Sequence, residues 1–243
     1  MNSVTRGLIL LVLTFAANAA KLPSFIQKCD KNDPNFGKCA IDLAHDIIPK
    51  LQNGYKELNF PPFVPFHVQE IAIEATDSLK LKLSDVDIFG LEKAKFNSID
   101  CNFNSMDCVS KIYFPELEVK GIYDIDGRVM ILPIKGHGPT NIKIVGGNFL
   151  ISFKWSIKQK EGVDYASIGK FELHYQTERS IFHFDNLFNG DKVLGDQMND
   201  FLNENWQELS REVEPAVSNT IAVILKSIFS KFADQIPYNE LFL

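Results

Sequence analysis

The chain has 243 residues, and its 25 basic and 31 acidic side chains are interspersed, without a polybasic run, to give a net charge of −6. This pattern argues against a nucleic-acid partner and against binding to an anionic membrane surface. The 20 phenylalanines are unusual for a chain with no internal membrane-spanning run. They are either ordinary core or the lining of an apolar cavity.

Residues 1–20 resemble a secretory signal peptide. Arg6 precedes the apolar run 8–13, and the segment ends in Ala17-Asn18-Ala19-Ala20. A basic start, a short apolar core and an A-x-A ending are typical of such signals. The alternative, an N-terminal anchor, needs a span of roughly 20 apolar residues, and this run is shorter. We therefore predict a signal peptide over 1–20 and one secreted domain over 21–243.

The four cysteines of the mature chain form two pairs that are close in sequence. Cys29 and Cys39 bracket a turn-forming stretch, so a bridge between them would fasten the N-terminus to a helix that the apolar spacing predicts over Gly37–Leu51. If Asn104-Ser105 is a hairpin turn, Cys101 lies directly opposite Cys108, close enough for a disulfide. Zinc is the competing use of cysteine, but the spacing does not suit it. We expect two disulfides, in keeping with an oxidising compartment.

From Phe66 to Phe184 the apolar pattern has a period of two, which is typical of antiparallel strands with one buried face. The clearest strand covers Phe149–Ile157. Turn signals separate the runs at Asp126-Gly127, Gly136-His137-Gly138-Pro139, Gly146-Gly147 and Glu161-Gly162. The pattern therefore predicts a meander of long strands without helices between them.

After Asp191 the period returns to 3.6, and one apolar stripe continues from Leu194 to Phe232. About 43 helical residues at 1.5 Å each would span roughly 65 Å, with a kink at Pro215. A helix of that length against a curved sheet implies an elongated body.

Elongation together with inward-facing phenylalanines favours a long apolar channel between sheet and helix. The residues predicted to bind ligand are Phe149, Ile151, Phe153, Trp155, Ile157, Phe171, Leu173, Tyr175, Phe201, Leu202 and Leu209. Some of these positions are expected to be plain core instead.

Sequence signatures of enzymes are absent: the chain has no G-x-S-x-G, H-E-x-x-H, G-x-G-x-x-G or P-loop pattern. Its five histidines do not cluster, and His174 and His183, expected on neighbouring strands without a carboxylate or cysteine companion, are interpreted as part of a polar sheet face. We therefore predict no catalytic residues, no metal site and no cofactor. No N-x-S/T acceptor is present, so we expect no N-glycan.

Several motifs resemble the insect takeout family, relatives of the haemolymph juvenile hormone binding proteins. The most specific is Asn186-Leu187-Phe188-Asn189-Gly190-Asp191, which continues into Phe201-Leu202-Asn203-Glu204-Asn205-Trp206. Four other pieces occur in the same order as in the family. They are the Cys29/Cys39 pair, Leu58-Asn59-Phe60-Pro61-Pro62, Leu132-Pro133-Ile134-Lys135-Gly136-His137-Gly138 and the ending Ile236-Pro237-Tyr238-Asn239-Glu240-Leu241-Phe242. In the first motif Asn189-Gly190 forms a turn and Asp191 caps a helix, so the motif is interpreted as structural.

The resemblance implies an α+β fold, in which a long, strongly curved antiparallel sheet wraps around one long C-terminal helix, as in the tubular lipid-binding proteins. It also implies a carrier of small hydrophobic molecules with links to circadian, feeding and chemosensory physiology. Juvenile hormone carriers have a second bridge in the later half of the chain. No cysteine follows Cys108 here, which places the chain with the takeout branch.

The leading functional hypothesis is a secreted carrier of a fatty acyl, isoprenoid or juvenile-hormone-like ligand, present in haemolymph or tissue fluid. The alternative is an extracellular interaction or signalling protein whose cavity is filled by its own side chains. We expect a monomer with a small hydrophobic ligand as its partner, without nucleic acid and without stable membrane insertion. A receptor is left open.

Overall fold

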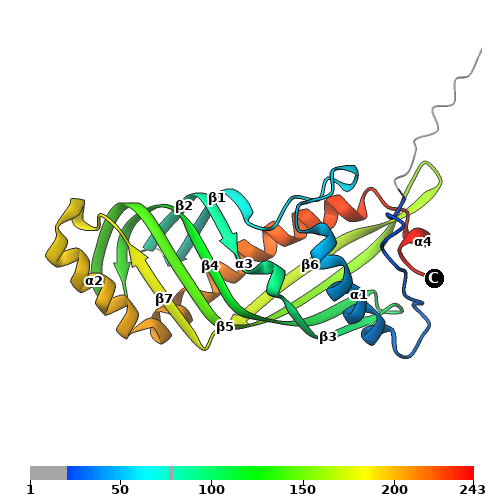
Figure 1. Cartoon of the computed structure of the whole chain (residues 1–243), viewed down its shortest axis with the longest axis horizontal. Coiled ribbons are helices and arrows are strands. Elements are labelled where there is room, and N and C mark those ends of the chain that lie inside the picture. The colour runs from blue at the N-terminus through cyan, green and yellow to red at the C-terminus, as the bar shows by residue number, and fades with distance from the viewer. Residues whose placement is uncertain (1–20, 77–78) are drawn as a thin grey trace, which may run out of the picture.

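The computed structural model describes residues 21–76 and 79–243, so the signal peptide predicted over 1–20 lies outside the described residues. The elements, in chain order, are α1 (Phe36–Leu51), η1 (Lys56–Leu58), β1 (Phe66–Thr76), β2 (Leu79–Phe89), η2 (Leu91–Lys93), β3 (Lys95–Asn102), β4 (Asp107–Val129), β5 (Leu132–Lys160), β6 (Val163–Gln176), β7 (Arg179–Phe184), η3 (Phe188–Gly190), α2 (Lys192–Glu204), α3 (Trp206–Ala233) and α4 (Tyr238–Leu241). Figure 1 shows an elongated body, with α2 at one end and α1 and α4 towards the other.

One antiparallel sheet of seven strands forms the body, with the strand order β1-β2-β4-β5-β6. The long strands β4 and β5 are its spine and pair from Asp107↔Lys154 to Val129↔Leu132. At one end β7 pairs with the first half of β5, and at the other end β3 pairs with the first half of β4. The sheet therefore has two different ends joined by two continuous strands.

Three of the four predicted turns are wrong, because the spine strands run through them. Asp126-Gly127 lies inside β4, and the chain reverses at Met130–Ile131 instead. Gly136 lies within β5, where a Cβ atom would come 2.5 Å from the Tyr123 hydroxyl. Gly146, with φ +63°, lies where β5 changes its partner from β7 to β6. Of the four, only Glu161-Gly162 forms a turn between strands.

The long C-terminal helix is broken at Asn205, and the expected kink at Pro215 is not where the helix divides. Asn205 has φ −104° and ψ 22°, and its backbone N–H and side-chain amide both donate to the Phe201 carbonyl. The backbone bond is the last one of α2, which ends because the ψ of Asn205 lies outside the helical region, and the Asn205 carbonyl then accepts from Leu209 N–H in the first turn of α3. Pro215 lies inside α3 at an exposed position. Among the described residues α3 is the one helix long and apolar enough to cross a membrane, a test that a core helix also meets.

Helix α3 closes the open side of the curved sheet, between its two edges. It packs against β6, β1 and β7, and it runs lengthwise through the molecule (Figure 1). On one side the Thr220 hydroxyl, which donates to the Ala216 carbonyl of its own helix at 2.9 Å, also lies 3.2 Å from the Ala72 carbonyl of β1. On the other side the Tyr175 N–H of β6 donates to the Glu214 carboxylate, over 3.4 Å. Side chains of one helix thus contact both edges.

Helix α2 bonds to the outer edge of β7 through two asparagines one turn apart. The Asn199 amide accepts from Phe184 N–H and donates to Phe184 C=O, at 2.9 and 3.0 Å. The Asn203 amide repeats both bonds with Phe182, at 2.9 and 2.8 Å. Four helical residues rise about 6 Å and two strand residues about 6.8 Å. The two amides are therefore spaced like the backbone N–H and C=O groups of every second residue, which point away from the sheet at the free edge of β7. The helix therefore takes the place of a neighbouring strand.

The interior consists of three consecutive clusters with different compositions. The first, beside α2, is largely aliphatic and includes Leu83, Val86 and Ile134. The middle cluster contains Phe149 and Leu173, and the third contains Trp155 and Cys108 beside α4. Most aromatic contacts belong to the second and third clusters and to the loops around them. The two ends of the body are therefore chemically distinct.

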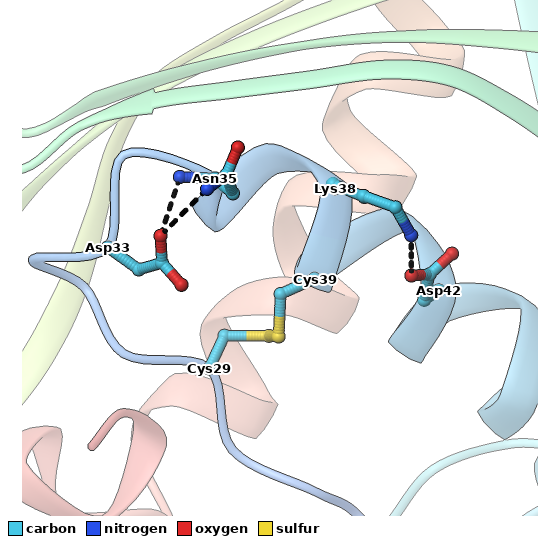
Figure 2. The surroundings of a disulfide bond; sticks show 6 residues. All are labelled: Cys29, Asp33, Asn35, Lys38, Cys39 and Asp42. Carbon is cyan, nitrogen blue, oxygen red and sulfur yellow. Dashed lines mark hydrogen bonds and ion pairs between the residues drawn. A yellow bond between two sulfur atoms is a disulfide. The ribbon is translucent and has the colours of Figure 1, made fainter.

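Both expected disulfides are present, and both lie at the aromatic end. Cys101 pairs with Cys108 opposite it on the β3–β4 hairpin, in the register that the sequence predicted. The Cys29–Cys39 disulfide ties the N-terminal loop to α1, as Figure 2 shows. In the same loop the Asp33 carboxylate accepts from Asn35 N–H at 2.8 Å, which orders the approach to the helix.

Candidate ligand cavity

An internal cavity of about 170 Å³ lies at the aliphatic end, between the curved sheet and helices α2 and α3. Alternate residues of the strands point into it, because successive side chains of a strand face opposite sides of the sheet. Its lining consists of Ile71, Ile73, Leu79, Leu81, Leu83, Ile88, Val119, Ile125, Val129, Ile134, Ile142, Ile144, Tyr175, Ser180, Phe182, Phe184, Leu202, Leu209, Ser210, Val213, Val217, Thr220 and Ile221. Aliphatic side chains dominate, and none of these residues is charged.

Four hydroxyl groups interrupt the apolar lining, and three of them already have protein partners. The Thr220 hydroxyl donates to the backbone, as described above. The Ser210 hydroxyl donates to the Ser180 hydroxyl over 3.3 Å, and Ser180 lies 3.1 Å from the Thr177 hydroxyl. These groups place hydrogen-bonding capacity on the wall where the β6–β7 turn meets α3.

The fourth hydroxyl belongs to Tyr175, and it makes no hydrogen bond within the described part of the chain. Burial, and then the nearby Glu214 carboxylate, raise the pKa of this phenol well above its usual range. The Glu214 carboxylate itself accepts from the Ser218 hydroxyl at 2.7 Å and lies 3.4 Å from His174 Nδ1. Tyr175 therefore stays protonated at neutral pH and offers an unused O–H to the cavity.

Tyr175 also marks where the cavity ends and the aromatic interior begins. Its ring stacks on Phe149 with centroids 5.5 Å apart, and Phe149 contacts Phe114 edge to face. Further along, Phe153 stacks on Phe171 at 5.8 Å, and both contact Phe229. Phenylalanines thus pack on one another beyond the cavity, while isoleucine, leucine and valine form most of its walls.

The structure brings three of the eleven predicted ligand-binding residues to the cavity: Tyr175, Leu202 and Leu209. The other eight lie outside its lining, and their contact with a ligand stays a prediction. The middle cluster contains Phe149, Ile151, Phe171 and Leu173, and the third cluster contains Phe153 and Trp155. Phe201 packs against the first cluster, and Ile157 is 36% exposed.

The cavity walls supplied by β1, β2, β4, β7 and the first half of β5 were not predicted from the sequence. The alternation of Ile71 and Ile73, and of Leu79, Leu81 and Leu83, indicates an inward face. Alternation alone does not distinguish a residue beside a cavity from one in solid core. That distinction depends on how the facing helix packs, which the pattern does not contain.

The described residues show no arrangement suited to metal chemistry. Within 21–76 and 79–243, no group of three or more histidine, cysteine, aspartate or glutamate side chains is placed to hold a metal ion. The cysteines of this part of the chain are all in disulfides. What the cavity offers is apolar surface with a few hydroxyl groups, an arrangement typical of a binding site for a hydrophobic molecule.

Comparison with known proteins agrees with this geometry. The sequence model of the family described as haemolymph juvenile hormone binding protein matches residues 8–243. The circadian clock-controlled protein daywake of Drosophila melanogaster is 26% identical over 234 residues, covering 90% of this chain and 88% of daywake. The daywake protein of Drosophila yakuba is 25% identical over 232 residues, with the same coverage of both chains.

A solved structure shares the fold. The crystal structure of Epiphyas postvittana Takeout 1 matches with a TM-score of 0.79 at 24% identity, covering 89% of this chain and 99% of that one. The expected architecture, a long antiparallel sheet with a long C-terminal helix in an elongated single domain, is confirmed. Because the family model extends over nearly the whole sequence, the chain belongs to the haemolymph juvenile hormone binding protein family.

Proposed function

We propose that this chain is a secreted carrier that holds one hydrophobic molecule in the cavity between the curved sheet and α3. The observation that carries the proposal is the lining itself, which is aliphatic, uncharged and interrupted by only four hydroxyl groups. Removing a ligand's apolar surface from water contributes about 25 cal/mol per Å², so a lining of this kind binds by area. The family is named for ligand binding, which supports the same reading.

Secretion rests on two features of the chain. Residues 1–20 have the composition of a signal peptide, and both cysteine pairs are bridged, as expected in an oxidising compartment. The proposed carrier acts as a monomer in haemolymph or tissue fluid, without stable membrane insertion. We also propose a role in daily rhythms, because the daywake relatives are circadian clock-controlled proteins.

The size of the cavity bears on the ligand. An engineered apolar cavity of about 150 Å³ admits benzene or xenon, so about 170 Å³ holds a small apolar group without rearrangement. A longer acyl or isoprenoid chain must continue past Tyr175 into the aromatic interior. It would then displace the Tyr175–Phe149 stack and reach Ile151 and Leu173, two of the contacts that the sequence predicts.

Filling the cavity from α3 tests the proposal. Val213 lines the cavity, whereas Val223 on the same helix is 62% exposed. Val213→Phe should weaken binding of an apolar fluorescent probe roughly tenfold, because losing about 60 Å² of ligand contact at 25 cal/mol per Å² costs about 1.5 kcal/mol. Val223→Phe, the matched control, should bind as the parent does.

Circular dichroism and thermal melting establish that each variant is folded, and Val217→Phe repeats the test from the next turn of α3. Folded Val213→Phe and Val217→Phe proteins that bind the probe as tightly as the parent would contradict the carrier proposal. That result would favour the alternative, an interaction protein whose interior is closed by its own side chains.

A further inference from the structure

The turn between β4 and β5 carries two apolar side chains into solvent, at the end of the body where α2 lies. Met130 and Ile131 form this turn, called here the β4–β5 tip. Ile131 is 84% exposed, more than any other large hydrophobic residue in the described part of the chain. The neighbours on either side point inward, since Val129 lines the cavity and Leu132 packs against the first cluster. The tip therefore lies directly outside the cavity wall.

The needs of the turn do not explain these two residues. Met130 has φ +55°, in the left-handed region that hairpin turns usually fill with glycine, asparagine or aspartate. The β5–β6 turn, at the other end of the sheet, meets the same need with Glu161 and Gly162. At the tip the sequence instead places two large apolar side chains where both backbone conformation and hydration disfavour them. Such an outlier points to a contact outside the chain.

Helix α2 adds two more exposed apolar side chains at the same end. Val193 is 67% exposed and Leu194 is 47% exposed, both in the first turn of the helix. Leu187 lies against Gly136 of β5 and against Gly195 of α2, which holds that first turn beside the start of β5. The end of the body that contains the cavity therefore presents apolar groups from two elements.

Charged side chains near the tip are mostly paired with one another. Lys135 lies 3.1 Å from Asp126 on the neighbouring strand. Lys192 lies 2.7 Å from Asp196, one turn along α2. Arg128 is exposed and makes no ion pair within the described residues. One such cation is not a polybasic surface, so a partner of the tip is recognised by its apolar character.

The small area of the tip decides between a protein partner and a lipid surface. Four side chains of this size bury about 100 Å² each, or about 400 Å² together. A stable protein interface buries roughly 800 Å² on each partner, so these four side chains are too few. A single myristoyl chain has a similar apolar area and gives marginal, reversible membrane binding. The tip is therefore suited to brief contact with lipid.

We propose that the β4–β5 tip docks reversibly on a zwitterionic lipid surface, and that ligand passes between that surface and the cavity. Apolar side chains follow one another from Ile131 to Val129, so a ligand that leaves at this end enters lipid with little exposure to water. Docking depends on the tip alone. The exchange of ligand rests on the proposed carrier function as well.

Flotation with phosphatidylcholine vesicles tests the docking. The parent should bind with an association constant on the order of 10⁴ M⁻¹. Ile131→Ser should bind at least about fivefold more weakly, because it removes the most exposed apolar side chain. Met130→Asn should also weaken binding, and it should keep the turn because asparagine tolerates the left-handed region. Val223→Ser, which changes an exposed apolar residue of α3, is the matched control and should bind as the parent does.

Three results of these measurements would overturn the docking. The first is flotation of folded Ile131→Ser and Met130→Asn equal to that of the parent, or no flotation of the parent. The second is binding that requires phosphatidylserine and disappears at high salt, since screening weakens charge contacts and not apolar ones. The third is a parent dimer in sedimentation equilibrium that Ile131→Ser dissociates, which would assign the tip to a second copy of the chain.

Transfer of a bound apolar fluorescent probe to vesicles tests the exchange. The transfer rate should rise in proportion to vesicle concentration, and Ile131→Ser should lower the slope about fivefold. Probe affinity without vesicles should not change, because Ile131 does not line the cavity. A rate independent of vesicle concentration would show release into water and would overturn the exchange. Failure of the parent to bind the probe would count against the carrier function, while flotation would still decide the docking.

Discussion

The two asparagines that bond α2 to β7 should contribute more to stability than their partly exposed positions suggest. Replacing Asn199 by alanine removes the acceptor of Phe184 N–H and the donor to Phe184 C=O. Leaving a buried backbone group without a partner costs about 1–3 kcal/mol. Alanine recovers about 0.5 kcal/mol or more of helix propensity, so we expect a net loss of about 2 kcal/mol in the free energy of unfolding. Asn203→Ala should behave alike, through its bonds with Phe182.

Urea unfolding with the disulfides intact measures this loss, and thermal melting should show a fall of about 4–8 °C for each variant. Gln197→Ala is the control, because Gln197 is an exposed amide on the same helix. Since Phe182 and Phe184 line the cavity, the asparagine variants should also release an apolar probe faster. If Asn199→Ala and Gln197→Ala unfold at the same urea concentration, α2 does not act as a neighbouring strand of β7.

Two side chains and one disulfide give further testable outcomes. Burial, and then the carboxylates of Asp185 and Asp124, raise the pKa of Tyr123 from 10 to about 12. Above pH 10 the unfolded chain therefore loses this proton before the folded chain does, and the free energy of unfolding falls by roughly 2–3 kcal/mol at pH 12. Tyr123→Phe should flatten that part of a stability–pH profile, and an unchanged slope would contradict this role of Tyr123. Phe149→Trp should weaken binding of a long-chain probe more than binding of a short one, because only the long chain extends past Tyr175 into the aromatic interior. Equal losses of affinity for the two probes in fluorescence titrations would contradict this route for the ligand. Peptide mapping without reduction should recover Cys101 and Cys108 as one bridged peptide, and alkylated free Cys101 would refute the bridge.

The fold could be predicted from local patterns where those patterns leave one solution. The opposed positions of Cys101 and Cys108 follow from the hairpin spacing, although the turn covers Phe103–Met106 and not two residues. Asp191 accepts from Leu194 N–H at the start of α2, as the capping pattern indicates. Such features depend only on residues close together in the sequence, so they can be predicted from the sequence alone.

Features that depend on distant contacts were not predictable. Gly136 looks like a turn residue, but its small size admits Tyr123 and Leu187 close to β5. The apolar stripe looks like one continuous helix from Leu194 to Phe232, but the chain divides at Asn205, whose ψ of 22° leaves the helical region. The phenylalanines look like the walls of a channel, but most of those predicted pack on one another. For Gly136 and for the phenylalanines, the outcome is decided by a partner that sequence spacing does not reveal.

If the cavity carries a hydrophobic molecule, the natively secreted protein should still hold that molecule after purification. Protein purified without detergent is extracted with organic solvent, and the extract is analysed by mass spectrometry beside an extract of the Val213→Phe variant. The parent should yield an apolar compound in near-equimolar amount, and the variant much less. An extract of the folded parent with no compound above the level of the variant, together with failure to take up added probe, would contradict it.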